Sequence, residues 1–279
     1  MPTGPLARPT VGLLLDYRLF FKKVKEEMEQ TDIDEIIRCI SELRLSTYKD
    51  KDLKEYVNII KKNQKIYPAM HLMEVIFRNK AHAAVSEILQ VKDWLLEFNR
   101  ENLDVIKSFS TLSKTSKEKS FWKMIFCKKN EIHTENEKTV SYENLKKEIN
   151  CAYKSSIEIA RVKKRSVIEG DLIAALTFGF WTTLFSKPYS NILGDKGLFI
   201  KTFNEINFNE IGKIGTKEYS SKESAIRKNI NDIRRNRNRV FHHEKLKDYE
   251  KTEKLIWEII SQMSNVSHDY FFNSFNESI

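Results

Sequence analysis

The sequence contains little of what strands and tight turns need. Its 279 residues include only 8 glycines and 5 prolines, and three of the prolines stand within the first nine residues. Glycine and proline are the residues that most often mark the turns between strands. No stretch alternates polar and apolar residues convincingly with a period of two. The sequence therefore predicts long helices and an all-α fold.

Cysteine is also scarce. The chain has three cysteines, Cys39, Cys127 and Cys151, which lie far apart and outside any C-x-x-C spacing. An odd number of isolated cysteines argues against a disulfide framework and against a cysteine zinc site, and it indicates a reducing, cytoplasmic environment. No acidic cluster has a convincing spacing of metal ligands. We therefore expect neither a metal nor another cofactor.

Long apolar runs are missing as well. The longest, LIAALTFGFWTTLF at 172–185, is shorter than the ~18 apolar residues of a membrane-spanning helix. We predict that it forms a buried helix and that the protein does not span a membrane. The start of the chain lacks the apolar segment of a signal peptide. We interpret residues 1–29 as an N-terminal tail.

Positive charge is in excess. The chain has 48 Lys and Arg against 39 Asp and Glu, which gives a net charge of +9 and a sequence pI near 9.2. Such a balance favours a polyanionic partner such as RNA or DNA. The alternative is a general lysine-rich composition that is basic without binding anything, and the charge alone leaves both open.

The periodicity of apolar residues predicts a single helical domain over residues 30–272. Residues 108–141 are mostly rich in Ser, Thr and Lys and are expected to be an insertion made of surface loops. Pro68 is placed in the first turn of a helix, where proline is tolerated. The expected helices cover residues 32–45, 51–64, 68–89, 91–106, 142–165, 171–186, 221–246 and 249–272.

Helix 68–89 carries polar residues on an otherwise apolar surface. His71, Glu74, Arg78 and His82 are spaced so that they share one stripe of the helix. A helix this apolar must be largely buried, so its polar residues need partners or line a cleft. Two interpretations stay open: a structural ion pair between Glu74 and Arg78, or a functional site.

The second polar segment is NDIRRNRNRVFHHEKL, residues 231–246. The apolar spacing of helix 221–246 places Arg237 where an apolar residue is expected. His242 is five residues further on, about 140° around the helix, so the two side chains do not stack. Asn238 and His242, four residues apart, do share a face. Arginine binds phosphate oxygens and histidine transfers protons near neutral pH, so the segment is either a basic binding face or a catalytic pair.

The motif RNRVFH at 237–242, Arg-Asn-x-x-x-His, matches the R-x4-6-H pattern of the HEPN superfamily of helical RNases. Three ordered segments, 66–85, 176–189 and 234–244, resemble landmarks of the Abi-like (abortive infection) branch of that superfamily. The resemblance covers roughly residues 30–272. It implies a HEPN-type helical bundle with extra helices, a homodimer with a shared cleft, and RNA as the substrate.

The resemblance implies metal-independent cleavage that leaves a 2′,3′-cyclic phosphate and serves phage defence or toxin–antitoxin action. The catalytic residues would be Arg237, His242 and Asn238. The supporting residues of the cleft would be Glu74, Arg78, Asn79, His82 and His243, of which His243 could replace His242. Outward-facing Arg234, Arg235 and Arg239 would bind RNA. The alternative is a non-catalytic helical module that binds RNA or an acidic antitoxin.

Overall fold

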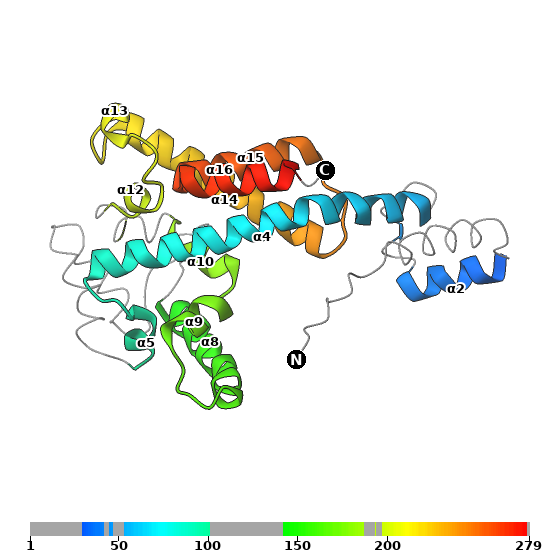
Figure 1. The fold of residues 1–279 in the computed structure, drawn as a ribbon, viewed down its shortest axis with the longest axis horizontal. Coiled ribbons are helices and arrows are strands. Elements are labelled where there is room, and N and C mark those ends of the chain that lie inside the picture. Colours follow the sequence, from blue (N-terminus) through cyan, green and yellow to red (C-terminus); the bar gives the residue numbers. More distant parts are fainter. Residues whose placement is uncertain are drawn as a thin grey trace, which may run out of the picture. The chain divides into compact units, whose positions relative to one another are not determined.

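The computed structural model describes residues 30–41, 45–46, 53–100, 142–186, 193 and 197–277. Within these ranges the chain is mostly helical and has no strand, which confirms the all-α prediction (Figure 1). The helices are α2 (Gln30–Ile40), α4 (Leu53–Leu89), α5 (Trp94–Asn99), α8 (Tyr142–Val162), α9 (Glu169–Ala175), α10 (Phe178–Leu184), α12 (Leu198–Thr202), α13 (Phe208–Ile211), α14 (Lys217–Phe241), α15 (Tyr249–Met263) and α16 (Asn265–Glu277). None of these helices is long and apolar enough to cross a bilayer. The predicted insertion at 108–141 and the tail at 1–29 lie outside the described residues.

The chain divides into two compact units, residues 1–61 and residues 62–279. The boundary falls within residues 30–272, which are predicted to form one domain. In the first unit, Leu45, Tyr56 and Ile59 form a small buried cluster. The second unit holds the main core and every residue of the candidate site.

The core of the second unit is built around α4 and is rich in aromatic rings. Phe77 of α4 is fully buried, and its ring lies 5.7 Å from Phe178, 5.1 Å from Phe185 and 6.3 Å from Phe203, measured between centroids. Rings at these separations add to the free energy gained by burying their apolar surface. The segments at 178–185 and 198–203 are thereby fixed against the middle of α4.

Helix α4 is longer than predicted because it continues through Pro68. The apolar spacing predicts separate helices at 51–64 and 68–89, and this prediction is wrong: one helix runs from Leu53 to Leu89 with Pro68 inside it. Proline removes the N–H that would bond to the carbonyl of Gln64. Gln64 and Pro68 are both exposed, so water can satisfy that carbonyl. Ile66 and Met70, buried on the opposite side, anchor both halves of the helix in the core.

The apolar segment predicted as one helix at 171–186 is two helices, α9 and α10. Leu176 between them is extended (φ −69°, ψ 136°). The hydroxyl of Thr177 accepts a hydrogen bond from the N–H of Phe180 at 3.1 Å and so starts α10. The helix predicted at 249–272 is also divided. Ser264 is extended there, and its hydroxyl accepts a hydrogen bond from the N–H of Ser267 at 3.2 Å.

Other boundaries differ less. The segment predicted at 91–106 is helical over α5 within its described part, and α8 agrees with the prediction at 142–165 to within a few residues. Helix α14 begins four residues earlier than predicted, because the hydroxyl of Thr216 accepts from the N–H of Tyr219 at 3.3 Å.

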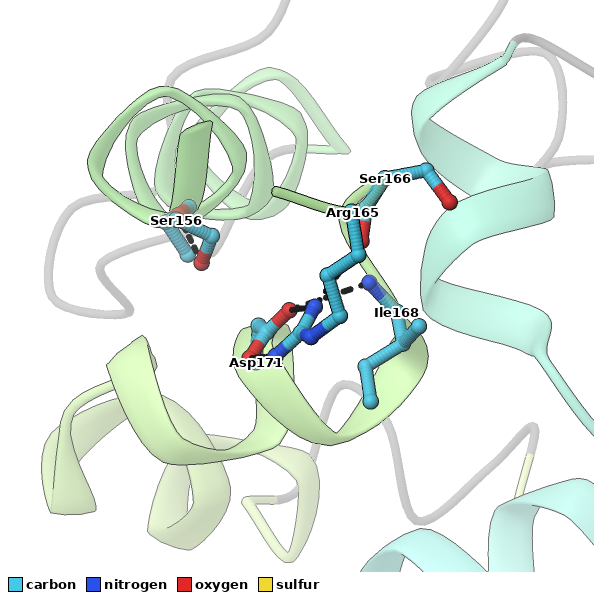
Figure 2. A network of polar contacts seen from close by, with 6 residues as sticks. Ser156, Arg165, Ser166, Ile168 and Asp171 are labelled. Atoms are coloured by element: carbon cyan, nitrogen blue, oxygen red, sulfur yellow. Dashed lines mark hydrogen bonds and ion pairs between the residues drawn. The ribbon is translucent and has the colours of Figure 1, made fainter. Parts of the chain in front are cut away.

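A bidentate ion pair closes the turn between α8 and α9, as Figure 2 shows. The Arg165 guanidinium contacts the two carboxylate oxygens of Asp171 at 2.6 and 2.8 Å. The same carboxylate accepts a hydrogen bond from the N–H of Ile168 at 3.0 Å, at the start of α9. The Arg165 hydrogen bonds, followed by that from Ile168, lower the pKa of Asp171 from 3.8 to about 2.

This pKa predicts a pH dependence of stability. The pKa in the folded protein lies below the unfolded value, so the carboxylate stabilises the fold above pH ~4 and loses that effect as the pH falls towards 2. Asp171→Asn is expected to lower the free energy of unfolding at pH 6, and its difference from wild type should shrink between pH 4 and pH 2. Urea unfolding at several pH values measures both. Arg165→Gln should reproduce the effect, and a difference that stays constant with pH would contradict the assignment.

Candidate functional site

The site lies on the last turns of α14. This helix buries Ile226, Ile230, Ile233 and Val240 along one side, which holds it against the core. It ends at Phe241, with His242 as the cap. Beyond the end, the N–H of His243 donates to the carbonyl of Val240 at 3.0 Å and the N–H of Glu244 donates to that of Arg239 at 2.8 Å. These two bonds form the Schellman motif that terminates many helices.

His243 occupies the position in this motif that usually holds glycine. Its φ is +56°, in the left-handed region that few residues other than glycine adopt readily. The backbone of His243 therefore serves to end the helix, whereas His242 has an ordinary φ of −91°. This difference favours His242 over His243 as the histidine with a chemical role.

Arg237 is held in place by its neighbours. Its Nε donates to Oε2 of Glu74 on α4 at 3.1 Å, and its Nη1 donates to Oδ1 of Asn238 at 3.4 Å. The guanidinium carbon lies 3.8 Å from the centre of the Phe241 ring, which is a cation–π contact. The Arg237 side chain is 28% exposed and that of Glu74 is 10% exposed. The guanidinium is thus oriented from several sides and still partly open to solvent.

Contacts between Arg237 and the end of α14 fix this helix against α4, and the two helices run in opposite directions (Figure 1). The rings of Tyr67 and Phe241 lie 5.0 Å apart between centroids. Beyond the end of α14, the side-chain amide of Asn63 donates to the carbonyl of Glu244 at 3.2 Å and accepts from the hydroxyl of Tyr249 at 2.8 Å. The end of α14 is therefore positioned by the buried side chain of Asn63 and the exposed ring of Tyr67, both on α4.

The ion pair considered between Glu74 and Arg78 is not formed. Glu74 binds Arg237, a residue 163 positions away in sequence. Among the described residues, Nε of Arg78 is buried and has no hydrogen-bond partner. Asn79, the third residue assigned to the cleft, is exposed. Of that group, the structure brings only Glu74 into contact with the predicted catalytic residues.

His82 has a structural environment. Its Nε2 lies 2.8 Å from Oε1 of Glu169, and its ring stacks on Trp94 at 5.9 Å between centroids. The Glu169 carboxylate also accepts hydrogen bonds from the N–H groups of Leu95 and Leu96, at 2.9 and 3.0 Å, at the start of α5. His82 follows Glu74 by eight residues, which is roughly 12 Å along α4. The structure therefore places His82 away from Arg237.

The structure does not bring Arg237 and His242 into contact within one chain. His242 is exposed at the end of α14, and none of the described side chains bonds to its imidazole. Asn238 is exposed, and its side-chain oxygen is directed to Arg237 rather than to His242. The separation agrees with the ~140° between positions five residues apart on a helix.

The three arginines predicted to bind RNA have different surroundings. Arg235 is exposed, with Nη1 3.5 Å from Asp232. Arg239 is exposed and lies 3.9 Å from Glu244. Arg234 is half-buried, and in the described part of the chain its buried Nε has no partner. The three arginines therefore do not form one uniform basic face.

Two residues that contact the predicted site residues Arg237 and His82 were not identified from the sequence. Phe241, under the Arg237 guanidinium, lies four residues after it, and that helical spacing could have indicated the contact. Glu169, which is buried and caps α5, gave no local signal because its partners are 73 to 87 residues away.

In the described ranges no three His, Cys, Asp or Glu side chains converge as metal ligands do. Comparison of the chain with family models, with curated proteins and with solved structures finds no match.

Proposed function

We propose that the protein is an endoribonuclease that cleaves RNA with Arg237 and His242, without a metal ion. The observation that carries the proposal is the oriented, partly exposed guanidinium of Arg237, followed five residues later by the exposed imidazole of His242. A fixed arginine stabilises charge on a phosphate in the transition state, and a histidine transfers protons. Asn238 supports Arg237 through its side-chain oxygen.

The reaction that fits these groups is transfer of the phosphate to the neighbouring 2′-hydroxyl. An unprotonated imidazole takes the proton of the 2′-hydroxyl, and the 2′ oxygen forms a bond to phosphorus. The bond from phosphorus to the 5′ oxygen breaks, and that oxygen takes up a proton from water, while the imidazolium returns its own proton to solvent. The products are a 2′,3′-cyclic phosphate and a 5′-hydroxyl. Arg237 would stabilise the negative charge on the non-bridging oxygens during this step.

A homodimer would bring the two residues together. Arg237 faces α4 and His242 is exposed at the end of α14, so one chain does not direct both at the same atom. A two-fold axis places the same surface of both chains face to face. We therefore place Arg237 of one chain and His242 of the second chain at each scissile phosphate. The resemblance to Abi-like HEPN proteins suggests phage defence, or a toxin restrained by an antitoxin, as the biological role.

One observation favours the alternative of a non-catalytic binding module. Glu74 already neutralises part of the charge on Arg237, so this arginine is less available to a ligand than a free one. In that case the protein would bind RNA or an acidic antitoxin and leave the RNA intact.

The test is cleavage of end-labelled tRNA and total RNA by the purified protein in EDTA. We expect defined fragments with 2′,3′-cyclic phosphate and 5′-hydroxyl ends. RNA that is retarded on a native gel and remains intact would contradict the nuclease and support the binding module. Fragments with 3′-hydroxyl ends would contradict the proposed chemistry.

A further inference from the structure

Two arginines beside the proposed site each have a buried Nε without an acceptor among the described residues. Nε of Arg78 on α4 and Nε of Arg234 on α14 are both buried, and neither has a hydrogen-bond partner among the described residues. No ion pair connects either side chain to a described carboxylate. A buried cationic N–H without an acceptor is unfavourable, and such groups in folded proteins require an explanation. An anionic ligand that is absent from the isolated chain would supply one.

The register of the two helices places these arginines at one level. Helices α4 and α14 run in opposite directions and meet at the Glu74–Arg237 ion pair. Arg78 follows Glu74 by four residues, and Arg234 precedes Arg237 by three residues. Each arginine is therefore about one helical turn from the ion pair. Because the helices are antiparallel, a later residue on α4 and an earlier residue on α14 are displaced from the ion pair in the same direction.

The charges at this level are unbalanced. Arg78, Arg234 and Arg237 contribute three positive charges, and Glu74, which binds Arg237, contributes one negative charge. Two neighbouring guanidinium groups repel each other, and an anion between them would offset that repulsion. Both side chains are half-buried, so an anion reaching them is partly shielded from water and is bound more strongly there than on an open surface.

We propose that Arg78 and Arg234 together bind the backbone phosphate next to the one held by Arg237. This inference rests on the proposed function, because it takes an RNA strand at Arg237 as given. A phosphodiester offers two non-bridging oxygens, enough for one guanidinium each. One helical turn is ~5.4 Å, which is comparable with the spacing of successive phosphates along a nucleic acid strand. This match favours a phosphate of the same strand over a free phosphate ion.

The test uses a 2′-O-methylated RNA oligonucleotide, which cannot be cleaved through its 2′ oxygen. Binding is measured at several salt concentrations for wild type, Arg78→Gln, Arg234→Gln and the double variant. Loss of one phosphate contact on a single strand reduces the slope of log K against log salt by ~0.7. Because both arginines hold the same phosphate, we expect a partial reduction in each single variant and the full reduction of ~0.7 in the double variant.

Two controls separate this phosphate contact from other effects. Arg161→Gln removes the same charge from an exposed position on α8 and should keep the wild-type slope. Arg78→Lys keeps the charge and should restore most of the slope. Thermal unfolding checks that each variant is folded. Since the two Nε groups have no partner among the described residues, the glutamine variants are expected to unfold at or above the wild-type temperature.

The outcomes distinguish this proposal from the nuclease itself. Wild-type slopes in both glutamine variants, or equal losses in Arg161→Gln, would overturn the phosphate site even if wild-type protein cleaves RNA. Failure of wild type to bind the oligonucleotide would also overturn it. Inorganic phosphate that raises the unfolding temperature of wild type, together with unchanged slopes for the oligonucleotide, would assign the arginines to a free anion and contradict the proposal. Reduced slopes in a protein that leaves RNA intact would support the site and contradict the nuclease.

Discussion

Removal of the His242 imidazole is expected to reduce RNA cleavage by about 10²–10⁴-fold, the usual contribution of a positioned acid or base. For Arg237 we expect a loss of ~10²–10³-fold, because the transition state loses a fixed charge on its phosphate. Single-turnover cleavage of a defined RNA by His242→Ala and by Arg237→Ala measures both losses. Binding of an uncleavable RNA should change much less in His242→Ala than its cleavage rate.

The arginine variant needs a control for stability. Arg237→Ala leaves the carboxylate of Glu74, 10% exposed, without its partner. The double variant Glu74→Gln with Arg237→Gln replaces the ion pair by two neutral amides that can still bond to each other. It should unfold near the wild-type temperature and remain inactive. A double variant that is folded and cleaves RNA at the wild-type rate would remove Arg237 from the mechanism.

A substitution of His243 tests which of the two adjacent histidines transfers the proton. His243→Gly removes the imidazole and suits the left-handed backbone at that position (φ +56°), so the helix end should be kept. We expect this variant to be as stable as wild type or more so, and to retain most of the cleavage that His242→Ala loses. The reverse pattern would assign the proton transfer to His243.

Glu169→Ala is expected to cause the largest loss of stability among the polar residues of the second unit. Its carboxylate contacts Nε2 of His82 and accepts from the N–H groups of Leu95 and Leu96 at the start of α5. Removing it leaves buried donors without acceptors and a helix without its cap, which together cost about 3 kcal/mol. For a domain of this size we expect the unfolding temperature to fall by roughly 6–12 °C.

Glu87 provides the matched control for Glu169. It lies on α4, its side chain is 61% exposed, and it pairs with Lys201 at the surface. Glu87→Ala should change the free energy of unfolding by at most ~0.5 kcal/mol, because exposed ion pairs contribute little. Equal effects of the two substitutions in urea unfolding would show that the Glu169 contacts do not stabilise the fold.

Much of the helical architecture could be predicted from periodicity alone. The breaks inside helices were harder to predict. Proline favours a helix start at Pro68, whereas α4 continues through it, because the carbonyl of the exposed residue Gln64 can bond to water. The spacing predicts that Thr177 and Ser264 are helical, whereas each caps a new helix with its hydroxyl. Serine and threonine fit both roles, and tertiary contacts decide between them.

The candidate site could be predicted only in part. The placement of Arg237 on the apolar side of α14 followed from helical spacing, and the structure shows it half-buried against α4. The ion pair between Arg237 and Glu74 could not be predicted. Helical spacing favours Arg78, four residues from Glu74, as the partner of Glu74, whereas Arg237 is 163 residues away. For His82, helical spacing gave the stripe that it shares with Glu74. Helical spacing could not show that His82, about two turns along α4 from Glu74, contacts Glu169.

The central claim is that Arg237 and His242 act on the same phosphodiester from two chains. The most direct test mixes two inactive proteins, Arg237→Ala and His242→Ala, after unfolding and joint refolding. In a two-fold dimer, a mixed pair keeps one intact site if the residues come from different chains, so an equal mixture should recover about one quarter of the wild-type cleavage rate. A mixture as inactive as its components, with mixed dimers shown to be present, would contradict the claim.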